Sequence, residues 1–246
     1  MPVFETLAML GSNLEIADLD AVARMDRTCD DIGIDTIEIG NTLGVAMEAG
    51  VLPFGEPRRA EQVLQDIAEG TTLGRVLGQG TAVTARVFGV ARVPVVKGQG
   101  IPAWEPRTLK GIGVTYATSP MGADHTAGMS VAKGLEGEAA MAASRELQTL
   151  VALQDTCGFC IFSNAPADAI ARMLNAWAGS TYGEQDVLDL GRSVLRQEIA
   201  FNRAAGISEA EDSLPPYLYK EALTVPSGEA VFDVDLPQDL QEALRL

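Results

Sequence analysis

Several residue types are scarce in this sequence of 246 residues, and each scarcity narrows the class of protein. Three cysteines are too few for a disulfide framework, and the odd number leaves at least one thiol unpaired, which favours a reducing compartment. Basic residues number 18 against 34 acidic ones, so the net charge of −16 argues against nucleic acid or an anionic membrane surface as a partner. No stretch approaches the roughly 18 consecutive apolar residues of a membrane-spanning helix. The first seven residues do not resemble a signal peptide, so we expect a cytoplasmic protein.

What the sequence does contain is enough apolar material for a large core, because 47% of the residues are hydrophobic and 21% are charged. Apolar residues at spacings of three and four, with capping residues at the ends, predict a mainly α fold. Asp18 is the expected N-cap of the first long helix, and Gly40 and Gly44, four residues apart, predict close packing against another backbone or against a ligand. The expected helices cover residues 18–31, 37–49, 58–69, 136–154, 166–178, 185–205 and 240–246, and a further helix is introduced by residues 70–72 and stops near residues 78–80. Between them, residues 93–122 are so rich in Gly and Pro that we expect a long, ordered and functional loop region.

One short pattern occurs twice, and each copy follows an expected helix. Residues 30–35 (the first motif) and 155–160 (the second motif) share the form Asp-x-x-Gly-apolar-(Asp or Cys). This form predicts an Asp in the last helical turn, a left-handed Gly, an apolar residue turned inward and a sixth residue presented from the following loop. An acid at a helix C-terminus is electrostatically unfavourable. A hydrogen-bond-donor ligand would offset that effect.

Other reactive residues have weaker support when each is taken alone. Cys157 and Cys160 form a single Cys-x-x-Cys pair, which without further ligands predicts buried small side chains better than a zinc or redox site. His125, the only histidine, is consistent with a structural role, although its place after the Gly/Pro-rich region favours a site. Glu5 is either a solvated residue near the chain start or a carboxylate in an apolar setting.

Four further stretches, together with the repeated motif, resemble the tungsten-containing aldehyde:ferredoxin oxidoreductases. They are residues 96–107, 117–125, 200–203 and 212–215, and they follow the family's order over nearly the whole chain. The resemblance implies two intertwined helical domains of the kind that form domains 2 and 3 of that family. We place one domain at residues 1–95, with the first pterin motif. The other, at residues 96–246, carries the active-site histidine loop and the second pterin and cluster motif.

The resemblance also implies roles for individual residues. In the family the two motifs bind the two pterins of a bis-molybdopterin cofactor (tungstopterin), which here would carry tungsten or molybdenum. One pterin would contact Asp30, Gly33, Ile34 and Asp35, and the other would contact Asp155, Gly158 and Phe159. Cys160 would bind one iron of a [4Fe-4S] cluster, while Cys157 falls on a variable position.

The implied reaction is the oxidation of a small aldehyde to a carboxylic acid, with electron transfer through the cluster to a ferredoxin-like acceptor. By the same resemblance, His125, and Glu5 in the run Phe4-Glu5-Thr6, would act in proton transfer and in polarising the carbonyl group. Reduction of an aromatic thioester on the same cofactor is an alternative, because substrate choice depends on loops whose sequence does not identify the substrate.

The sequence departs from the family in one important respect. Family members carry a preceding portion that supplies a β-sheet base for the pterins and three cluster cysteines in a Cys-x-x-Cys-x-x-x-Cys run, which is absent here. A [4Fe-4S] cluster normally needs four thiolates. We therefore expect a partner subunit that supplies the base and the three cysteines. A truncated product, or a cofactor-free remnant or scaffold protein of the same fold, are the alternatives.

Overall fold

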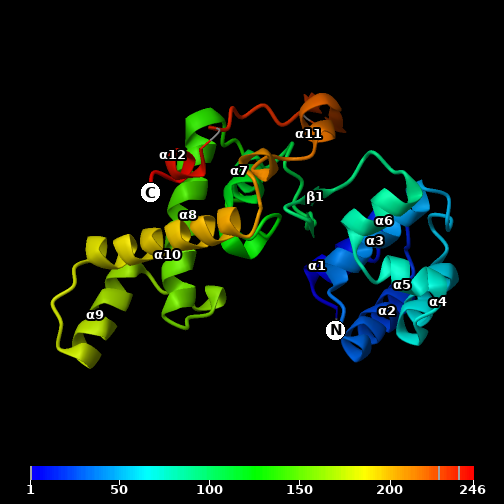
Figure 1. Ribbon diagram of the computed structural model, residues 1–246, viewed down its shortest axis with the longest axis horizontal. Helices are drawn as coiled ribbons and strands as arrows, with labels where there is room; N and C mark the ends of the chain where they lie inside the picture. The colour runs from blue at the N-terminus through cyan, green and yellow to red at the C-terminus, as the bar shows by residue number, and fades with distance from the viewer. Residues whose placement is uncertain (1, 227, 238) are drawn as a thin grey trace. The chain divides into compact units, whose positions relative to one another are not determined.

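A computed structural model describes residues 2–226, 228–237 and 239–246, and it confirms the mainly helical class (Figure 1). The chain divides into two compact units, residues 1–103 and 104–246, which are described separately below. Residues just beyond 95 stay with the first unit because Asn41 Nδ2 donates to the Ile101 carbonyl (2.9 Å) and Gly100 N donates to the Glu38 carboxylate (2.7 Å). Our domain boundary after residue 95, with one pterin motif on each side, stays a prediction.

The first unit consists of short helices and one small hairpin. Its elements are α1 (Phe4–Met9), η1 (Ser12–Leu14), α2 (Leu19–Ile32), α3 (Thr36–Glu48), α4 (Pro57–Glu69), α5 (Thr72–Leu77), α6 (Thr81–Phe88), β1 (Val95–Val96) and β2 (Gln99–Gly100). The two strands pair in antiparallel fashion. The predicted cap at Asp18 is confirmed, because its carboxylate accepts hydrogen bonds from the amides of Asp20 and Ala21. Helices α1 and α6 were not predicted from the sequence.

Helix α3 lies at the centre of the first unit and is largely buried. Its two glycines were expected to allow a close approach, and the structure shows what approaches. A Cβ atom on Gly40 would lie 2.7 Å from the Met9 carbonyl oxygen, whereas one on Gly44 would meet only the Asn13 side chain, at 3.3 Å. The chain at the end of α1 therefore packs directly on α3.

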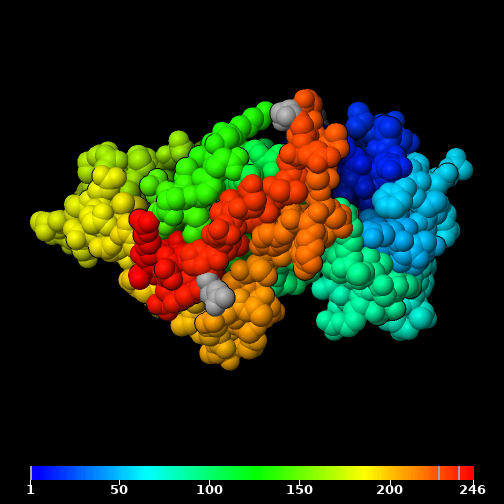
Figure 2. Space-filling view, turned by 90° about the horizontal axis from the view of Figure 1, so that it is seen from above, coloured from blue at the N-terminus to red at the C-terminus, as the bar shows by residue number. Residues whose placement is uncertain are grey.

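The second unit is built on two long helices. Its elements are α7 (Lys110–Thr118), η2 (His125–Ala127), α8 (Gly137–Thr156), η3 (Ile161–Ser163), α9 (Ala167–Ala178), α10 (Glu184–Ala204), η4 (Glu209–Glu211), α11 (Pro216–Lys220), β3 (Leu223–Val225), β4 (Gly228–Ala230) and α12 (Leu240–Leu244). Helix α10 packs on α8, and a Cβ atom on Gly191 would lie 2.4 Å from the Thr149 carbonyl oxygen. Figure 2 shows the end of the chain (red) packed against α7 and α8 (green), in agreement with the contacts of α12.

Helix α7 corrects our expectation that residues 93–122 contain no regular helix. Residues 111–118 are all buried, so α7 is a core element. Its glycines are sites of close packing: a Cβ atom would lie 2.3 Å from Ser130 Oγ at Gly111, and 2.5 Å from the Phe232 ring at Gly113. Tertiary packing thus outweighs the low helix propensity of glycine. Among the described residues, no helix combines the length and the apolar composition needed to cross a bilayer.

Candidate functional site

The two copies of the repeated motif end their helices in the same way. At the end of α2, Gly33 has φ +73°, and Ile34 N donates to the Cys29 carbonyl (2.9 Å). At the end of α8, Gly158 has φ +77°, and Phe159 N donates to the Gln154 carbonyl (2.9 Å). In both copies the glycine amide donates to the carbonyl of the motif's first Asp. The predicted helix-end geometry is therefore confirmed, including the apolar residue, which packs against a core in each unit.

This geometry exposes one carboxylate at each helix end. Asp30 and Asp155 both lie at the surface in the last turn, and neither side chain accepts a hydrogen bond from any residue that the structure describes. Both charges lie at the negative end of a helix dipole, where an acid is destabilising. Asp35 differs, because its carboxylate accepts a hydrogen bond from Glu38 N (2.7 Å) and caps α3. Two acids are thus available for a ligand that donates hydrogen bonds.

The surroundings of the first motif are strongly acidic. Burial, followed by the charges of Asp26, Asp30 and Asp35, raises the pKa of the Cys29 thiol to about 12. Cys29 is fully buried, so it is a core residue and an inert thiol.

Helix α1 brings the run Phe4-Glu5-Thr6 next to the first motif. Thr6 Oγ1 contacts Thr36 Oγ1 (3.0 Å) and donates to Asp26 (3.3 Å). Glu5 is only 8% exposed, and its Oε2 accepts a hydrogen bond from Ala103 N (2.8 Å). The carboxylate of Glu5 is therefore a buried, oriented group and does not extend from a solvated chain end.

In the second unit, His125 lies on the loop that joins α7 to α8 and is partly buried. The preceding residue, Asp124, sets this turn, because its Oδ1 accepts hydrogen bonds from Thr126 N (2.7 Å) and Thr126 Oγ1 (2.6 Å). Burial and then the charge of Asp124 raise the pKa of Asp155. The histidine loop and the end of α8 are therefore neighbours.

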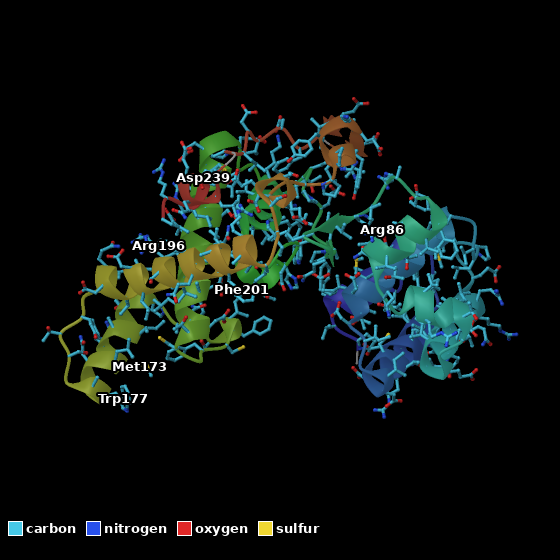
Figure 3. The ribbon with its side chains drawn as sticks, viewed as in Figure 1. Arg86, Met173, Trp177, Arg196, Phe201 and Asp239 are labelled. Carbon is cyan, nitrogen blue, oxygen red and sulfur yellow. The ribbon has the colours of Figure 1, made fainter. Side chains whose placement is uncertain are left out.

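A further carboxylate from α10 joins these two acids. Burial and then the charge of Asp155 raise the pKa of Glu198. Beside it, a groove of about 600 Å³ lies between the loop and α10, lined by Pro120, Met121, Val194, Gln197, Glu198, Phe201 and Asn202. Phe201, at the end of α10, is 72% exposed (Figure 3). The groove combines apolar walls with one acid, Glu198, whose side chain is exposed.

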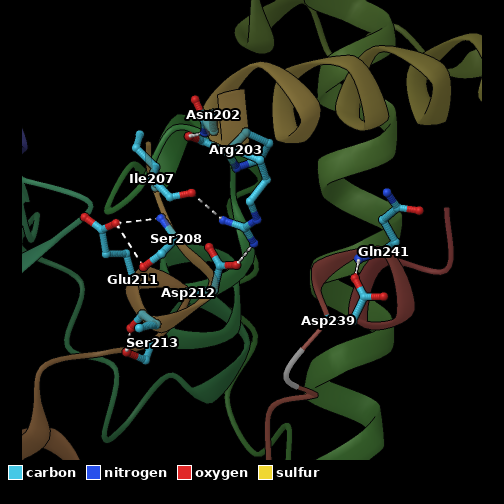
Figure 4. A network of polar contacts seen from close by, with 11 residues as sticks. Asn202, Arg203, Ile207, Ser208, Glu211, Asp212, Ser213, Asp239 and Gln241 are labelled. Atoms are coloured by element: carbon cyan, nitrogen blue, oxygen red, sulfur yellow. Dashed lines mark hydrogen bonds and ion pairs between the residues drawn. The ribbon is translucent and has the colours of Figure 1, made fainter. Parts of the chain in front are cut away.

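The stretches 200–203 and 212–215 hold this loop and the segment that follows α10. Asn202 Nδ2 donates to the Pro120 carbonyl (2.7 Å), at the entry of the histidine loop. Arg203 forms an ion pair with the buried Asp212 and donates to the Ile207 carbonyl (3.0 Å), as Figure 4 shows. Asn202, Arg203 and Asp212 therefore have a structural role beside the site.

Cys160 is exposed and begins the single turn η3. Burial raises the pKa of Cys157, three residues earlier, which suits a packing role. Among the described residues no group of three or more His, Cys, Asp and Glu side chains is arranged to hold a metal ion. A second pocket of about 720 Å³, lined by residues within 209–219 and 231–237, contains none of the expected site residues.

The structure thus gathers the expected residues into two groups. Glu5, Asp30 and Asp35 belong to the first unit, and His125, Asp155 and Cys160 belong to the second. Sequence reasoning missed Asp124 and Glu198. The pattern Asp-x-Thr around His125 is typical of a side-chain-capped turn and offered a signal for Asp124. No local pattern marks Glu198, because α10 reaches the site only through tertiary packing.

Comparison with known proteins identifies the family of the chain. The chain matches a family described as "Aldehyde ferredoxin oxidoreductase, domains 2 & 3" over residues 1–246. It therefore belongs to the aldehyde ferredoxin oxidoreductase family and contains domains 2 and 3 of that family.

Several curated relatives are similar over most of this chain. Tungsten-containing aldehyde ferredoxin oxidoreductases of Thermococcus kodakarensis and Pyrococcus furiosus are 30% and 28% identical over 92% of this chain and 42% of their own length. An "aliphatic sulfonate oxidoreductase, WOR-like subunit" of Pyrococcus furiosus is 25% identical, over 39% of its length. The chain thus spans about two fifths of the length of these relatives.

A solved structure shares the fold. It is described as the active site complex BamBC of benzoyl coenzyme A reductase with 1,5-dienoyl-CoA, and it superposes with a TM-score of 0.70 at 14% identity. The match covers 88% of this chain and 43% of the other. At this identity the likeness supports the helical architecture alone.

Proposed function

We propose that this chain is the part of a bis-pterin tungsten or molybdenum oxidoreductase that carries the two pterin-binding motifs. The complete enzyme oxidises an aldehyde to a carboxylic acid and transfers electrons through a [4Fe-4S] cluster. A separate subunit supplies the β-sheet base and the three other cluster cysteines. The family membership and the length of the relatives, of which this chain spans about two fifths, support this division of labour.

One observation carries the proposal. Asp30 and Asp155 occupy equivalent positions at two helix ends that have the same hydrogen-bond geometry, and neither carboxylate accepts a hydrogen bond from the described residues. Each is placed where the helix dipole disfavours its charge, so protein stability alone does not explain it. A pterin ring carries amino and ring N–H groups that suit such an acceptor. The two carboxylate acceptors therefore fit the N–H groups of the cofactor.

The remaining residues of the site have roles that follow from their positions. When bound, the bis-pterin metal would supply the two-electron chemistry that aldehyde oxidation needs, and the cluster would supply single-electron transfer. Asp30 and Asp155 accept N–H hydrogen bonds and orient the two ring systems. An imidazole N–H of His125 donates to the carbonyl oxygen and polarises the carbonyl group, and the carboxylate of Glu5, oriented by Ala103 N, accepts a proton.

Cys160 provides one ligand to the cluster. Its thiol is exposed on a short turn, so a second polypeptide has access to it. Four thiolates are the usual ligand set of such a cluster. The two other cysteines are not positioned to bind it, because Cys29 is buried and Cys157 packs against the core beside α9. The proposal therefore requires a partner, which passes the electrons to a ferredoxin-like acceptor.

The substrate is an aldehyde in this proposal because four of the relatives are named aldehyde ferredoxin oxidoreductases. A further relative is named for aliphatic sulfonates, so the same domains serve more than one substrate class. Aldehyde-dependent dye reduction by the assembled complex tests the assignment. Turnover of an aromatic thioester with no turnover of aldehydes would favour the alternative reaction.

Cofactor content of variants tests the residue assignments in the assembled complex. We expect Asp155→Ala to lower the pterin content. Cys160→Ala should remove the iron and its visible absorption while leaving part of the pterin bound. Cys157→Ala is the matched control, because this cysteine lies in the same turn and has no proposed ligand role. Equal and negligible effects of Asp155→Ala and Cys160→Ala on cofactor content would contradict the assignment.

A further inference from the structure

Just after His125, the backbone of the loop contacts helix α8. Gly128 N donates to the His125 carbonyl (3.4 Å), so Gly128 closes the turn that holds the histidine. A Cβ atom on Gly128 would lie 3.0 Å from Gln148 N and 3.1 Å from Gln148 Cγ. The main chain of the loop therefore rests directly on α8 at Gln148.

Four buried polar side chains lie beneath this contact. They are Thr115 and Thr118 of α7 and Ser144 and Gln148 of α8, and each is at most 1% exposed. Gln148 Nε2 lies 2.9 Å from Thr118 Oγ1 and 3.0 Å from Ser144 Oγ. Ser144 Oγ lies 2.7 Å from Thr115 Oγ1, which in turn lies 3.1 Å from the Gly128 carbonyl oxygen. These atoms form a continuous chain from the amide of Gln148 to the backbone of the loop.

The donor and acceptor in each of these hydrogen bonds follow from the number of hydrogen atoms that each group can donate. Gln148 Nε2 donates one hydrogen to each neighbouring hydroxyl, and Thr118 donates its own hydrogen to the Val114 carbonyl (2.7 Å). Ser144, having accepted from Gln148, donates to Thr115 Oγ1. Thr115 then donates to the Gly128 carbonyl, which is closer than its alternative, the Gly111 carbonyl at 3.3 Å. With the Gln148 amide in this orientation, each hydroxyl accepts once and donates once.

We propose that Gln148 is a positioning residue for His125, acting through Ser144, Thr115 and the Gly128 carbonyl. Without the Gln148 amide, Ser144 and Thr115 are free to reverse their shared hydrogen bond, and Gly128 loses its hydroxyl donor. Asn202 holds the entry of the same loop at the Pro120 carbonyl, so the histidine turn is held at both ends. The catalytic use of this position rests on the proposed function, whereas the position itself does not.

The single histidine makes the proposal measurable without cofactor or substrate. In the chain labelled at His with ¹³C, the imidazole Cε1–Hε1 group gives one cross-peak. We expect Gln148→Met, which keeps the side-chain volume and removes the hydrogen bonds, to move or broaden that cross-peak. The control is Gln154→Met on the same helix, because Gln154 is equally buried and donates to Ala165 O (2.8 Å), away from the loop.

An unchanged cross-peak in folded Gln148→Met, or an equal displacement in Gln154→Met, would overturn the proposal. Should Gln148→Met not fold, Thr115→Val removes only the hydroxyl that donates to Gly128. Its control is Thr149→Val, which removes a buried hydroxyl bonded within α8 to the Arg145 carbonyl (2.9 Å). The cross-peak should then move in Thr115→Val alone. A complex found to lack metal would contradict the proposed function and leave this result intact.

Discussion

Replacing Asp155 by Asn should stabilise the chain when no cofactor is bound. Asp155 lies in the last turn of α8, where the helix dipole disfavours a negative charge, and Asp124 adds like-charge repulsion. Removing a charge from a helix C-terminus typically changes stability by about 0.3–1 kcal/mol at low ionic strength. For a chain of this size that corresponds to a rise of roughly 1–4 °C in the midpoint of thermal unfolding.

The stabilisation expected for Asp155→Asn depends on pH. The pKa of Asp155 is raised in the folded protein, so the folded state holds the proton more tightly than the unfolded state. The charge therefore costs stability only above the ordinary carboxyl range, near pH 3.9, and the cost grows as the pH rises through the folded pKa. The gain from Asp155→Asn should be present at pH 7 and vanish at about pH 3.5.

Thermal unfolding followed by circular dichroism at low salt measures the effect. Asp168→Asn is the control, since Asp168 lies in the first turn of α9 and its hydrogen bond to Arg172 lowers its pKa. That variant should lose stability at pH 7, the opposite sign. A loss of stability in Asp155→Asn at pH 7, or a gain of equal size at both pH values, would refute the view that this acid is retained at the expense of stability.

Three other predictions follow from the packing and the site. Gly40→Ala should destabilise the chain by about 1–3 kcal/mol in urea unfolding, because its Cβ would clash with the backbone of α1, whereas Gly44→Ala should be nearly neutral. Arg203→Met removes the cation that pairs with the buried carboxylate of Asp212, so we expect a loss of roughly 3–5 kcal/mol; a loss below 1 kcal/mol would show that the pair contributes no more than a surface ion pair. His125→Asn should abolish most turnover of the assembled complex with metal content unchanged, and full turnover would remove His125 from the chemistry.

The sequence predicted those parts of the structure that depend on local chemistry. Both copies of the repeated motif end their helices as expected, because a left-handed glycine and its two hydrogen bonds involve only six neighbouring residues. The cap at Asp18 is predicted for the same reason, whereas the spacing of Gly40 and Gly44 indicates a close approach without identifying Met9 as the neighbour.

The parts that the sequence did not predict depend on distant residues. The sequence predicts a loop in place of helix α7 because Gly111 and Gly113 resemble helix breakers. In the structure these two glycines pack against Ser130 and Phe232. The charge of Asp155 raises the pKa of Glu198 on another helix, and Gln148 is linked to the histidine loop through the hydroxyls of Ser144 and Thr115. Such contacts leave no periodic pattern in the chain. The roles of the individual site residues stay predictions until cofactor content is measured.

Metal analysis with visible absorption spectroscopy, on this chain purified gently from its native source, tests the central claim most directly. The account predicts tungsten or molybdenum near one atom per chain, iron with cluster absorption, and a second polypeptide that remains attached. A single metal-free chain, or an attached partner without metal, would contradict it and identify a protein that keeps the fold without the chemistry.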